Sequence, residues 1–343
     1  MFNEQINEAP TMKAIGFLTP SPTLSPTSFE EFSLPDPVPL GNDLLIHVKA
    51  ASVNPVDYKE RRKRLSDKWV PVILGWDGAG DVVGVGSHVT GFKQGDKVFW
   101  SGDFRRPGSN ASLQCVDYRL VSHMPKLLDY PAAAAMPLTA ITAYEALFER
   151  LRVPRRDAGQ ILVIGGAGGV GSVAIQLLRA LSDAEVYATA GRQESKSWTI
   201  SMGAHHVVER VDLLDERARQ KLPQFDYVFS TTHTDTYHDI FPELISVGGR
   251  LGFIDDPLAF DVMPFKSKSI GVHPELIFSK GLYGSNIESQ GQMLAEIANL
   301  IDSKALRSTV NTVLDGLTTA AIHEAHKLQE SGTTIGKTVI RYL

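Results

Sequence analysis

The chain has 343 residues, and its 34 lysines and arginines stand against 39 aspartates and glutamates, giving a formal net charge of -5. This balance argues against a dedicated nucleic-acid surface, because binding phosphates needs clustered cations. The single cysteine, Cys115, excludes an intrachain disulfide and a thiolate-rich zinc site, and it predicts a reducing compartment such as the cytoplasm. No apolar run reaches the roughly 18 residues of a membrane span. The length itself predicts two domains.

The first third of the chain is predicted to be rich in antiparallel strands. After an N-terminal extension, strands are expected at residues 12–18 and at 44–53, where apolar and polar residues alternate. Over residues 72–100, short valine-rich runs are separated by Gly-Asp and Gly-Ser turns, which is typical of antiparallel sheets or barrels. Residues 132–147 then have helical composition.

Residues 160–181 change from strand to helix periodicity at a run of glycines. Residues 161–164 form an unbroken apolar run, as expected of a parallel strand buried on both faces. Gly166, Gly168 and Gly171 follow in the pattern G-x-G-x-x-G, which permits a tight turn, a close approach of backbone to a pyrophosphate, and close packing of helix on strand. The free N–H groups of the following helix predict a dinucleotide diphosphate there. The alternative is a glycine-rich turn without a ligand.

Beyond this helix, predicted strands and helices alternate. Strands are expected at residues 185–191, 205–209, 225–232 and 248–255, with helices up to Trp198 and over 235–245. This alternation indicates a parallel sheet with helices on both faces. Helices near 293–302 and 318–330 and a final strand from residue 337 follow. The sequence therefore predicts an α/β protein in which a doubly wound domain, residues 136–277, interrupts a β-rich domain made of residues 1–135 and 278–343.

Several short motifs carry a family resemblance over nearly the whole chain. They are VNPVD, GWDGAG, FKQGDKV, RPGSNA, PLTAITA, GGAGGVGS, FSTTHTD and GTTIGK. Through them the chain resembles the zinc-independent quinone oxidoreductase branch of the medium-chain dehydrogenase/reductase superfamily, close to proteins labelled zinc-type alcohol dehydrogenase-like. The resemblance implies a GroES-like catalytic domain interrupted by a Rossmann domain, and a cofactor in the cleft between them. It also implies a homodimer in which the strand at residues 269–273 pairs with its two-fold mate.

The resemblance also bears on metal binding. In zinc-dependent relatives a Cys, a His and a Glu stand where this chain has Asn54, Trp76 and Asp77. Asparagine and tryptophan do not replace those ligands, because zinc prefers about four sulfur, imidazole or carboxylate donors. No metal site is therefore expected. His323 and His326 lie three residues apart on a predicted helix, whereas the metalloprotease spacing is four, and we interpret them as a solvated helix face.

The end of the second strand of the doubly wound domain favours NADPH over NADH. NAD-specific domains usually carry Asp or Glu there, about 20 residues past the glycines. This chain has Ala190, followed by the cations Arg192 and Lys196. The carboxylate that would repel a 2′-phosphate is missing and two cations are present. The open alternative is that both cations form a helix-start pair with Glu194 and that the protein accepts both cofactors.

Three residues are candidate hydrogen-bond donors to a substrate. The resemblance places Asn54 at the former metal-ligand position, with turn chemistry before Pro55 as its alternative. Tyr58 directly follows the VNPVD motif, earlier than the tyrosine of better-known quinone reductases. His233 follows a strand end, where ligands of open parallel sheets gather. The resemblance also places Thr142 near the nicotinamide, and Lys337 near the nicotinamide or the substrate. The expected cofactor-binding residues are Thr142, Gly166, Gly168, Gly169, Val170, Gly171, Arg192, Ser195, Lys196, Thr232 and Lys337.

The expected activity is hydride transfer from NADPH to a quinone or an α,β-unsaturated carbonyl. Without zinc to polarise an alcohol oxygen, an acceptor that is already electrophilic is the easiest to reduce. The protein would position the reactants in a dry cleft and donate hydrogen bonds to the developing oxyanion. Two alternatives stay open: a zinc-dependent alcohol dehydrogenase, and a non-catalytic NADPH-binding protein with a structural or regulatory role. Apart from this small-molecule substrate and a second copy of the chain, no nucleic-acid or membrane partner is expected.

Overall fold

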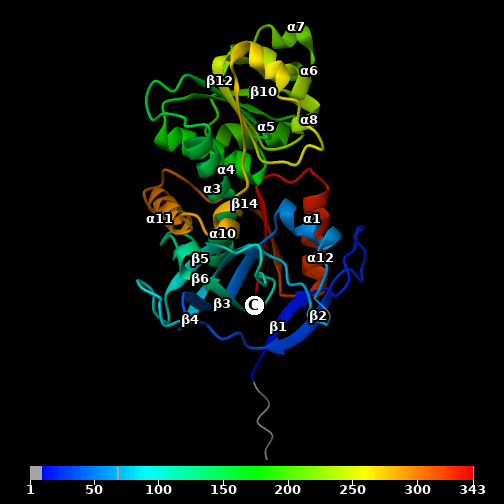
Figure 1. The fold of residues 1–343 in the computed structure, drawn as a ribbon, viewed down its shortest axis with the longest axis vertical. Helices are drawn as coiled ribbons and strands as arrows, with labels where there is room; N and C mark the ends of the chain where they lie inside the picture. The colour runs from blue at the N-terminus through cyan, green and yellow to red at the C-terminus, as the bar shows by residue number, and fades with distance from the viewer. Residues whose placement is uncertain (1–9, 68, 343) are drawn as a thin grey trace, which may run out of the picture.

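The structure is a computed structural model that describes residues 10–67 and 69–342. It has two parts, stacked along the longest axis in Figure 1: a β-rich part formed by both ends of the chain, and a part built on a parallel sheet by the middle of the chain. The predicted extension before Met12 lies almost entirely outside the described residues. In this described portion, no helix combines the length and apolar character needed to cross a membrane.

The β-rich part is organised around a sheet that, in the described residues, has seven strands in the order β14-β15-β3-β4-β5-β7, with β6 also paired to β3. A separate antiparallel pair joins β1 to β2. The elements from the first part of the chain are β1 (Thr11–Gly16), β2 (Glu30–Pro35), β3 (Asp43–Ser52), α1 (Pro55–Lys63), β4 (Asp77–Val85), β5 (Lys97–Ser101), β6 (Leu113–Asp117), η1 (Tyr118–Leu120), β7 (Val121–His123), α2 (Tyr130–Ala134), α3 (Pro137–Tyr144) and η2 (Glu145–Arg150). The antiparallel β3–β4 and β4–β5 pairs confirm the prediction for residues 72–100.

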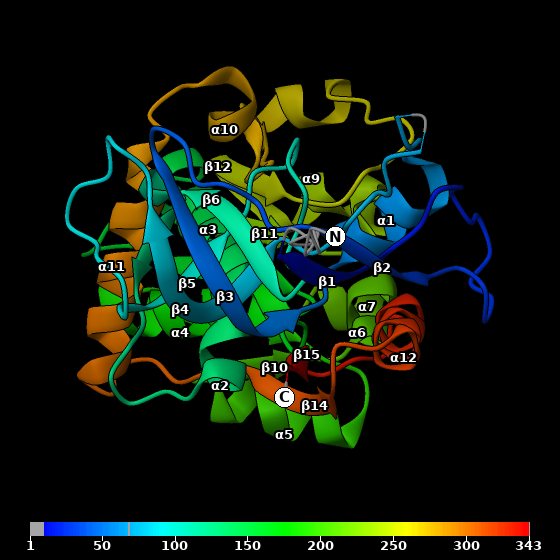
Figure 2. The ribbon, with the colours of Figure 1, turned by 90° about the horizontal axis from the view of Figure 1, so that it is seen from below.

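The last segment of the chain returns to this sheet. Its elements are α10 (Ser279–Tyr283), α11 (Glu288–Asp302), β14 (Val310–Asp315), α12 (Thr319–Glu330) and β15 (Lys337–Arg341). Strand β15 pairs antiparallel with β3, placing Val339 opposite Ser52. Seen from below, α11 and α12 lie on opposite sides of the sheet (Figure 2). The two ends of the chain therefore build one structural unit, as the interrupted arrangement requires.

The middle of the chain forms the Rossmann part. Its described strands are ordered β10-β9-β8-β11-β12-β13, and every pair is parallel. The elements are β8 (Gln160–Ile164), α4 (Gly169–Leu181), β9 (Glu185–Thr189), α5 (Gln193–Ser201), β10 (His206–Val208), α6 (Arg210–Leu214), α7 (Glu216–Arg219), β11 (Phe225–Ser230), α8 (Thr234–Tyr237), η3 (His238–Ile240), α9 (Phe241–Leu244), β12 (Ile245–Phe253), η4 (Met263–Lys268) and β13 (Gly271–Pro274). The predicted parallel sheet and fold class are confirmed, while the exact domain limits stay predictions.

Two local predictions are wrong. The helix expected over residues 235–245 is broken into α8, η3 and α9, and Ile245 already belongs to β12. Pro242 lies in the first turn of α9, and a proline there starts a helix more readily than it continues one, because it has no N–H to donate. The interpretation of His323 and His326 as a solvated face of α12 is also wrong for His326, which is 1% exposed. Its ring packs edge-on against Phe29, with centroids 4.8 Å apart, and burial lowers its pKa to about 3.

Helix α3 joins the two parts of the molecule. Its small and apolar side chains belong to the same hydrophobic core as Val173 and Leu177 of α4 and Phe99 of β5. Alanines at 140 and 143 are fully buried, which lets neighbouring backbones approach closely. One continuous core therefore supports both walls of the cleft described next.

Candidate active site

A cavity of about 710 Å³ lies between the carboxyl ends of the Rossmann strands and the β-rich part. Ile164, Thr189 and Thr231 line it from the strand ends, and Asn54 and Phe104 line it from the other side. Ligands of open parallel sheets bind at this edge, and the volume suits a large organic ligand.

The glycine turn forms the floor of the cavity. The residue with a positive φ is Gly165, at 82°, so the tight turn lies one residue before the predicted Gly166. A Cβ on Gly166 would lie 2.8 Å from Cβ of Ala188, and one on Gly171 would collide with the Gly165 carbonyl. Both glycines allow close packing, and in the described structure neither lines the cavity. Gly168 does line it, and a Cβ there would lie 3.5 Å from the Gly165 oxygen.

The first turn of α4 presents free donors to this space. The Gly168 N–H is bonded to the Gly165 carbonyl, and the Ser172 N–H to the Gly168 carbonyl. The N–H groups of residues 169–171 lie between them and have no backbone acceptor within the described helix. Gly169 and Val170, two of the predicted cofactor-binding residues, line the cavity. This cradle fits a diphosphate.

Cations line the part of the cavity next to the start of α5, where a ribose phosphate is expected. Arg192 precedes α5, and its guanidinium donates to the Thr333 carbonyl of the β-rich part. Ser195 also lines the cavity, and its hydroxyl accepts from the Arg192 N–H at 3.0 Å. Lys196 instead binds Glu209 at 2.5 Å and, in the described structure, does not line the cavity.

Arg210 is a cavity-lining cation that sequence reasoning missed. It begins α6, directly after the short strand β10, so its place past a strand end was the available signal. Neither Arg192 nor Lys196 forms an ion pair with Glu194 within the part of the chain that the structure describes. The alternative of a helix-start pair with Glu194 is therefore not what holds them.

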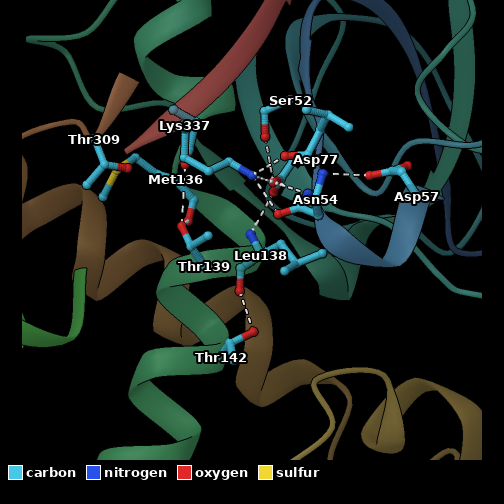
Figure 3. Close-up of polar contacts among 12 residues, drawn as sticks. Ser52, Asn54, Asp57, Asp77, Met136, Leu138, Thr139, Thr142, Thr309 and Lys337 are labelled. Atoms are coloured by element: carbon cyan, nitrogen blue, oxygen red, sulfur yellow. Dashed lines mark hydrogen bonds and ion pairs between the residues drawn. The ribbon is translucent and has the colours of Figure 1, made fainter. Parts of the chain in front are cut away.

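A buried network of charged and polar groups lies at the reactive end (Figure 3). Asp77 accepts from Ser52 Oγ at 2.7 Å, from Asn54 Nδ2 at 2.8 Å and from the Leu138 N–H at 2.6 Å. The Lys337 ammonium lies 3.2 Å from the same carboxylate. Burial lowers the pKa of this ammonium, and the charge of Asp77 opposes that effect.

The three candidate donors all line the one cavity. Asn54 is buried beside Asp77, and its backbone N–H donates to Asp57, whose pKa burial raises to about 7. The Tyr58 ring is covered by the Arg62 guanidinium, 4.9 Å from its centroid. His233 has a left-handed backbone, with φ 55°, and its Nδ1 lies 2.7 Å from the hydroxyl of Thr232. Their roles stay predictions.

Thr142 also lines the cavity, but its hydroxyl donates to the Leu138 carbonyl one turn earlier, at 2.7 Å. It can therefore offer only acceptor lone pairs to a ligand. Lys337 reaches the cavity with part of its stem, since a Cβ on Gly169 would lie 2.8 Å from its Cδ. Its ammonium is directed into the buried network of Asn54 and Asp77, and its place near the nicotinamide or the substrate stays a prediction.

These residues do not fit a zinc ion. The Trp76 indole stacks on Phe104, with centroids 5.4 Å apart, and has no lone pair to offer. The oxygens of Asn54 and Asp77 already face the cation of Lys337. Across residues 10–67 and 69–342, no three His, Cys, Asp or Glu side chains form a group that could hold a metal.

An aromatic wall forms one side of the cavity. Phe104 and Phe278 line it, with ring centroids 5.0 Å apart, and Arg64 lies 4.3 Å above the Phe104 ring. Sequence reasoning missed both phenylalanines, which come from segments 174 positions apart that meet only in the folded chain. Such a wall suits a planar, conjugated ligand.

A cluster of carboxyl groups supports the segment that carries Phe278. Burial, reinforced by the charge of Glu145, raises the pKa of Glu275 to about 8. Arg150 lies 2.6 Å from Glu275, and Lys280 bridges Glu145 at 3.0 Å and Glu149 at 2.8 Å. No sequence motif had marked this cluster.

Comparison with known proteins agrees with this architecture. Residues 41–124 match the family described as "Alcohol dehydrogenase GroES-like domain", and residues 202–340 match "Zinc-binding dehydrogenase". A zinc-type alcohol dehydrogenase-like protein of Staphylococcus epidermidis is 36% identical, covering 96% of this chain and 99% of that protein. A 2-methylene-furan-3-one reductase of Solanum lycopersicum is 36% identical over 55% of this chain and 50% of its own length.

Two solved structures extend the comparison. A putative zinc-dependent alcohol dehydrogenase of Rhizobium etli is 44% identical, with a TM-score of 0.93, covering 98% of this chain and 99% of that one. The quinone oxidoreductase of Coxiella burnetii is 25% identical, with a TM-score of 0.80, covering 97% and 100%.

Proposed function

The chain belongs to the medium-chain dehydrogenase/reductase superfamily of oxidoreductases, and within it we propose a reductase that uses NADPH to reduce a quinone or an α,β-unsaturated carbonyl without zinc. One observation carries the proposal: a single cavity joins the free N–H groups of α4 to Asn54 and to the wall of Phe104 and Phe278. The cofactor cradle and the acceptor pocket are therefore continuous.

Three sets of cavity-lining residues would hold the cofactor. The N–H groups of Gly169 and Val170 bind the diphosphate, and Arg192 and Arg210 bind the 2′-phosphate. Thr142 and Thr232 line the same cavity as Asn54. When bound, NADPH supplies the hydride, and the protein supplies position and electrostatics.

The acceptor would lie against Phe104 and Phe278 with its carbonyl toward Asn54. An N–H of the Asn54 amide donates to the oxygen on which negative charge develops, and the aromatic wall keeps water away. The similarity to the tomato 2-methylene-furan-3-one reductase and the Coxiella quinone oxidoreductase supports this acceptor class. The misfit of Asn54, Trp76 and Asp77 to zinc supports chemistry in which no metal polarises the oxygen.

The test is NADPH consumption with a panel of acceptors: a naphthoquinone, cyclohexenone, and the matched saturated ketone cyclohexanone. We expect turnover of the quinone or the enone and none of the saturated ketone. Oxidation of an alcohol that is lost on chelation, together with stoichiometric zinc, would identify a zinc-dependent alcohol dehydrogenase instead. Tight NADPH binding with no turnover of any acceptor would indicate a non-catalytic binding protein.

A further inference from the structure

The Lys337 ammonium is fully engaged by three acceptors. It donates to the Val53 carbonyl at 2.8 Å and to Asn54 Oδ1 at 2.5 Å, and it lies 3.2 Å from Asp77 Oδ2. An ammonium carries three N–H donors and no acceptor, so these contacts use all of them. Figure 3 shows the lysine entering from β15 between the side chains of Asn54 and Asp77.

Asp77 accepts a hydrogen bond from the Asn54 amide, whereas Lys337 donates one to it. Asp77 is a buried carboxylate that accepts from Ser52, from the Leu138 N–H and from Asn54 Nδ2. The Asn54 amide is therefore held between a group that only donates and a group that only accepts. Turning the amide over would set its oxygen against the carboxylate and its nitrogen against the ammonium. In a buried site both contacts would be strongly unfavourable.

We propose that Lys337 is a positioning residue that, together with Asp77, fixes the Asn54 amide so that its remaining Nδ2–H is the group offered to the acceptor oxygen. The amide oxygen is occupied by Lys337, and one amide hydrogen by Asp77. The second hydrogen has no acceptor among the described residues, and Asn54 lines the cavity. This role rests on the proposed function, since it concerns the acceptor of that reaction.

The same contacts could instead serve only to hold β15, β4 and α1 together. A double-mutant cycle separates this structural role from the positioning role of Lys337. We expect Lys337→Met and Asn54→Ala each to lower kcat with the enone by roughly 10²-fold, the usual effect of losing one oxyanion donor. The double variant should lose no more than either single variant, because Lys337 acts through Asn54. Losses that multiply, or an unchanged kcat in Lys337→Met, would overturn the proposal.

A second measurement does not depend on turnover. The dissociation constant of the enone for the complex with NADP⁺ should rise by roughly 2- to 10-fold, and equally, in both single variants and in the double variant. A wild-type constant in Lys337→Met would overturn the positioning role even if catalysis fell. A wild-type protein that reduces no quinone or enone would instead overturn the proposed function, and this binding arm would still decide the positioning role.

Two further variants control for impaired folding and for the general effect of replacing a lysine with methionine. Lys337→Met leaves Asp77 as a buried charge without its cation, which can impair folding. Lys337→Met combined with Asp77→Asn removes both charges and frees the Asn54 amide to turn, so it should show the same loss of kcat; wild-type kcat there would overturn the proposal. Lys327→Met removes an exposed lysine of α12 and should leave both measurements unchanged.

Discussion

The guanidinium of Arg192 in the Rossmann part donates a hydrogen bond to the Thr333 carbonyl in the β-rich part. One side chain thus links both walls of the cavity at the end where a 2′-phosphate would lie. Arg210 lines the same end, whereas Lys196 is held by Glu209.

The first prediction concerns cofactor choice. A charge-assisted hydrogen bond is worth about 1.5 to 3 kcal/mol, so Arg192→Ala should weaken NADPH binding roughly 10- to 150-fold and leave NADH nearly unchanged. Arg210→Ala should act in the same direction. Titration of both cofactors measures this, with Lys196→Ala as the control that should change little. Equal losses for NADH and NADPH would mean that Arg192 only supports the loop.

The second prediction concerns the diphosphate cradle. Gly168→Val places a side chain where the cavity is open, and the backbone there, with φ -73° and ψ 172°, is accessible to valine. The protein should fold with a nearly unchanged melting temperature and lose measurable NADPH binding. Gly171→Val is the contrasting variant, because its Cβ would collide with the Gly165 carbonyl and should destabilise the fold. Ordinary NADPH affinity in folded Gly168→Val would remove the cradle from the site.

The third prediction concerns stability against pH. The pKa of Glu275 is raised to about 8 from the ordinary 4.5, so between these values the folded protein holds a proton that the unfolded chain has released. Its contribution to the free energy of unfolding therefore falls as pH rises from about 4.5 to about 8 and is level outside that range. Glu275→Gln imitates the protonated acid. It should match wild type near pH 5 and melt a few degrees higher near pH 9.

Melting curves at several pH values test this third prediction. Asp57, whose pKa is also raised, contributes to wild type and variant alike and cancels in the comparison. Glu324→Gln, at a partly exposed site on α12, is the matched control and should show no such pH-dependent difference. A difference between Glu275→Gln and wild type that stays constant from pH 5 to 9 would contradict the assigned protonation.

The fourth prediction concerns assembly. In the described residues β13 is the last strand of the Rossmann sheet, with β12 on one side and no strand on the other. Pairing with the same strand of a second copy would cover that edge in a closed two-fold dimer. Sedimentation at micromolar concentration should give twice the mass of the chain, and amides of β13 should exchange more slowly as concentration rises. A monomer under these conditions would rule the dimer out.

Local patterns in the sequence were enough to predict much of the fold. The apolar run of β8, the glycines and the helical stripe of α4 are contiguous, so their periods report the change from strand to helix directly. The alternation that follows predicted the parallel sheet. The same local reasoning failed at residues 235–245, where Pro242 interrupts the helix, and at His326, where Phe29 covers a face that looked solvated.

Contacts between side chains far apart in the sequence become visible only in the folded chain. The sequence alone was enough to identify the glycine turn, the missing acid at Ala190 and the unusual Asn54, because each matches or departs from a known motif within a few residues. It could not show that Lys337 lies against Asp77, 260 positions away, or that Arg192 reaches Thr333. Such contacts depend on how elements far apart in the sequence pack together, and no local period encodes that packing.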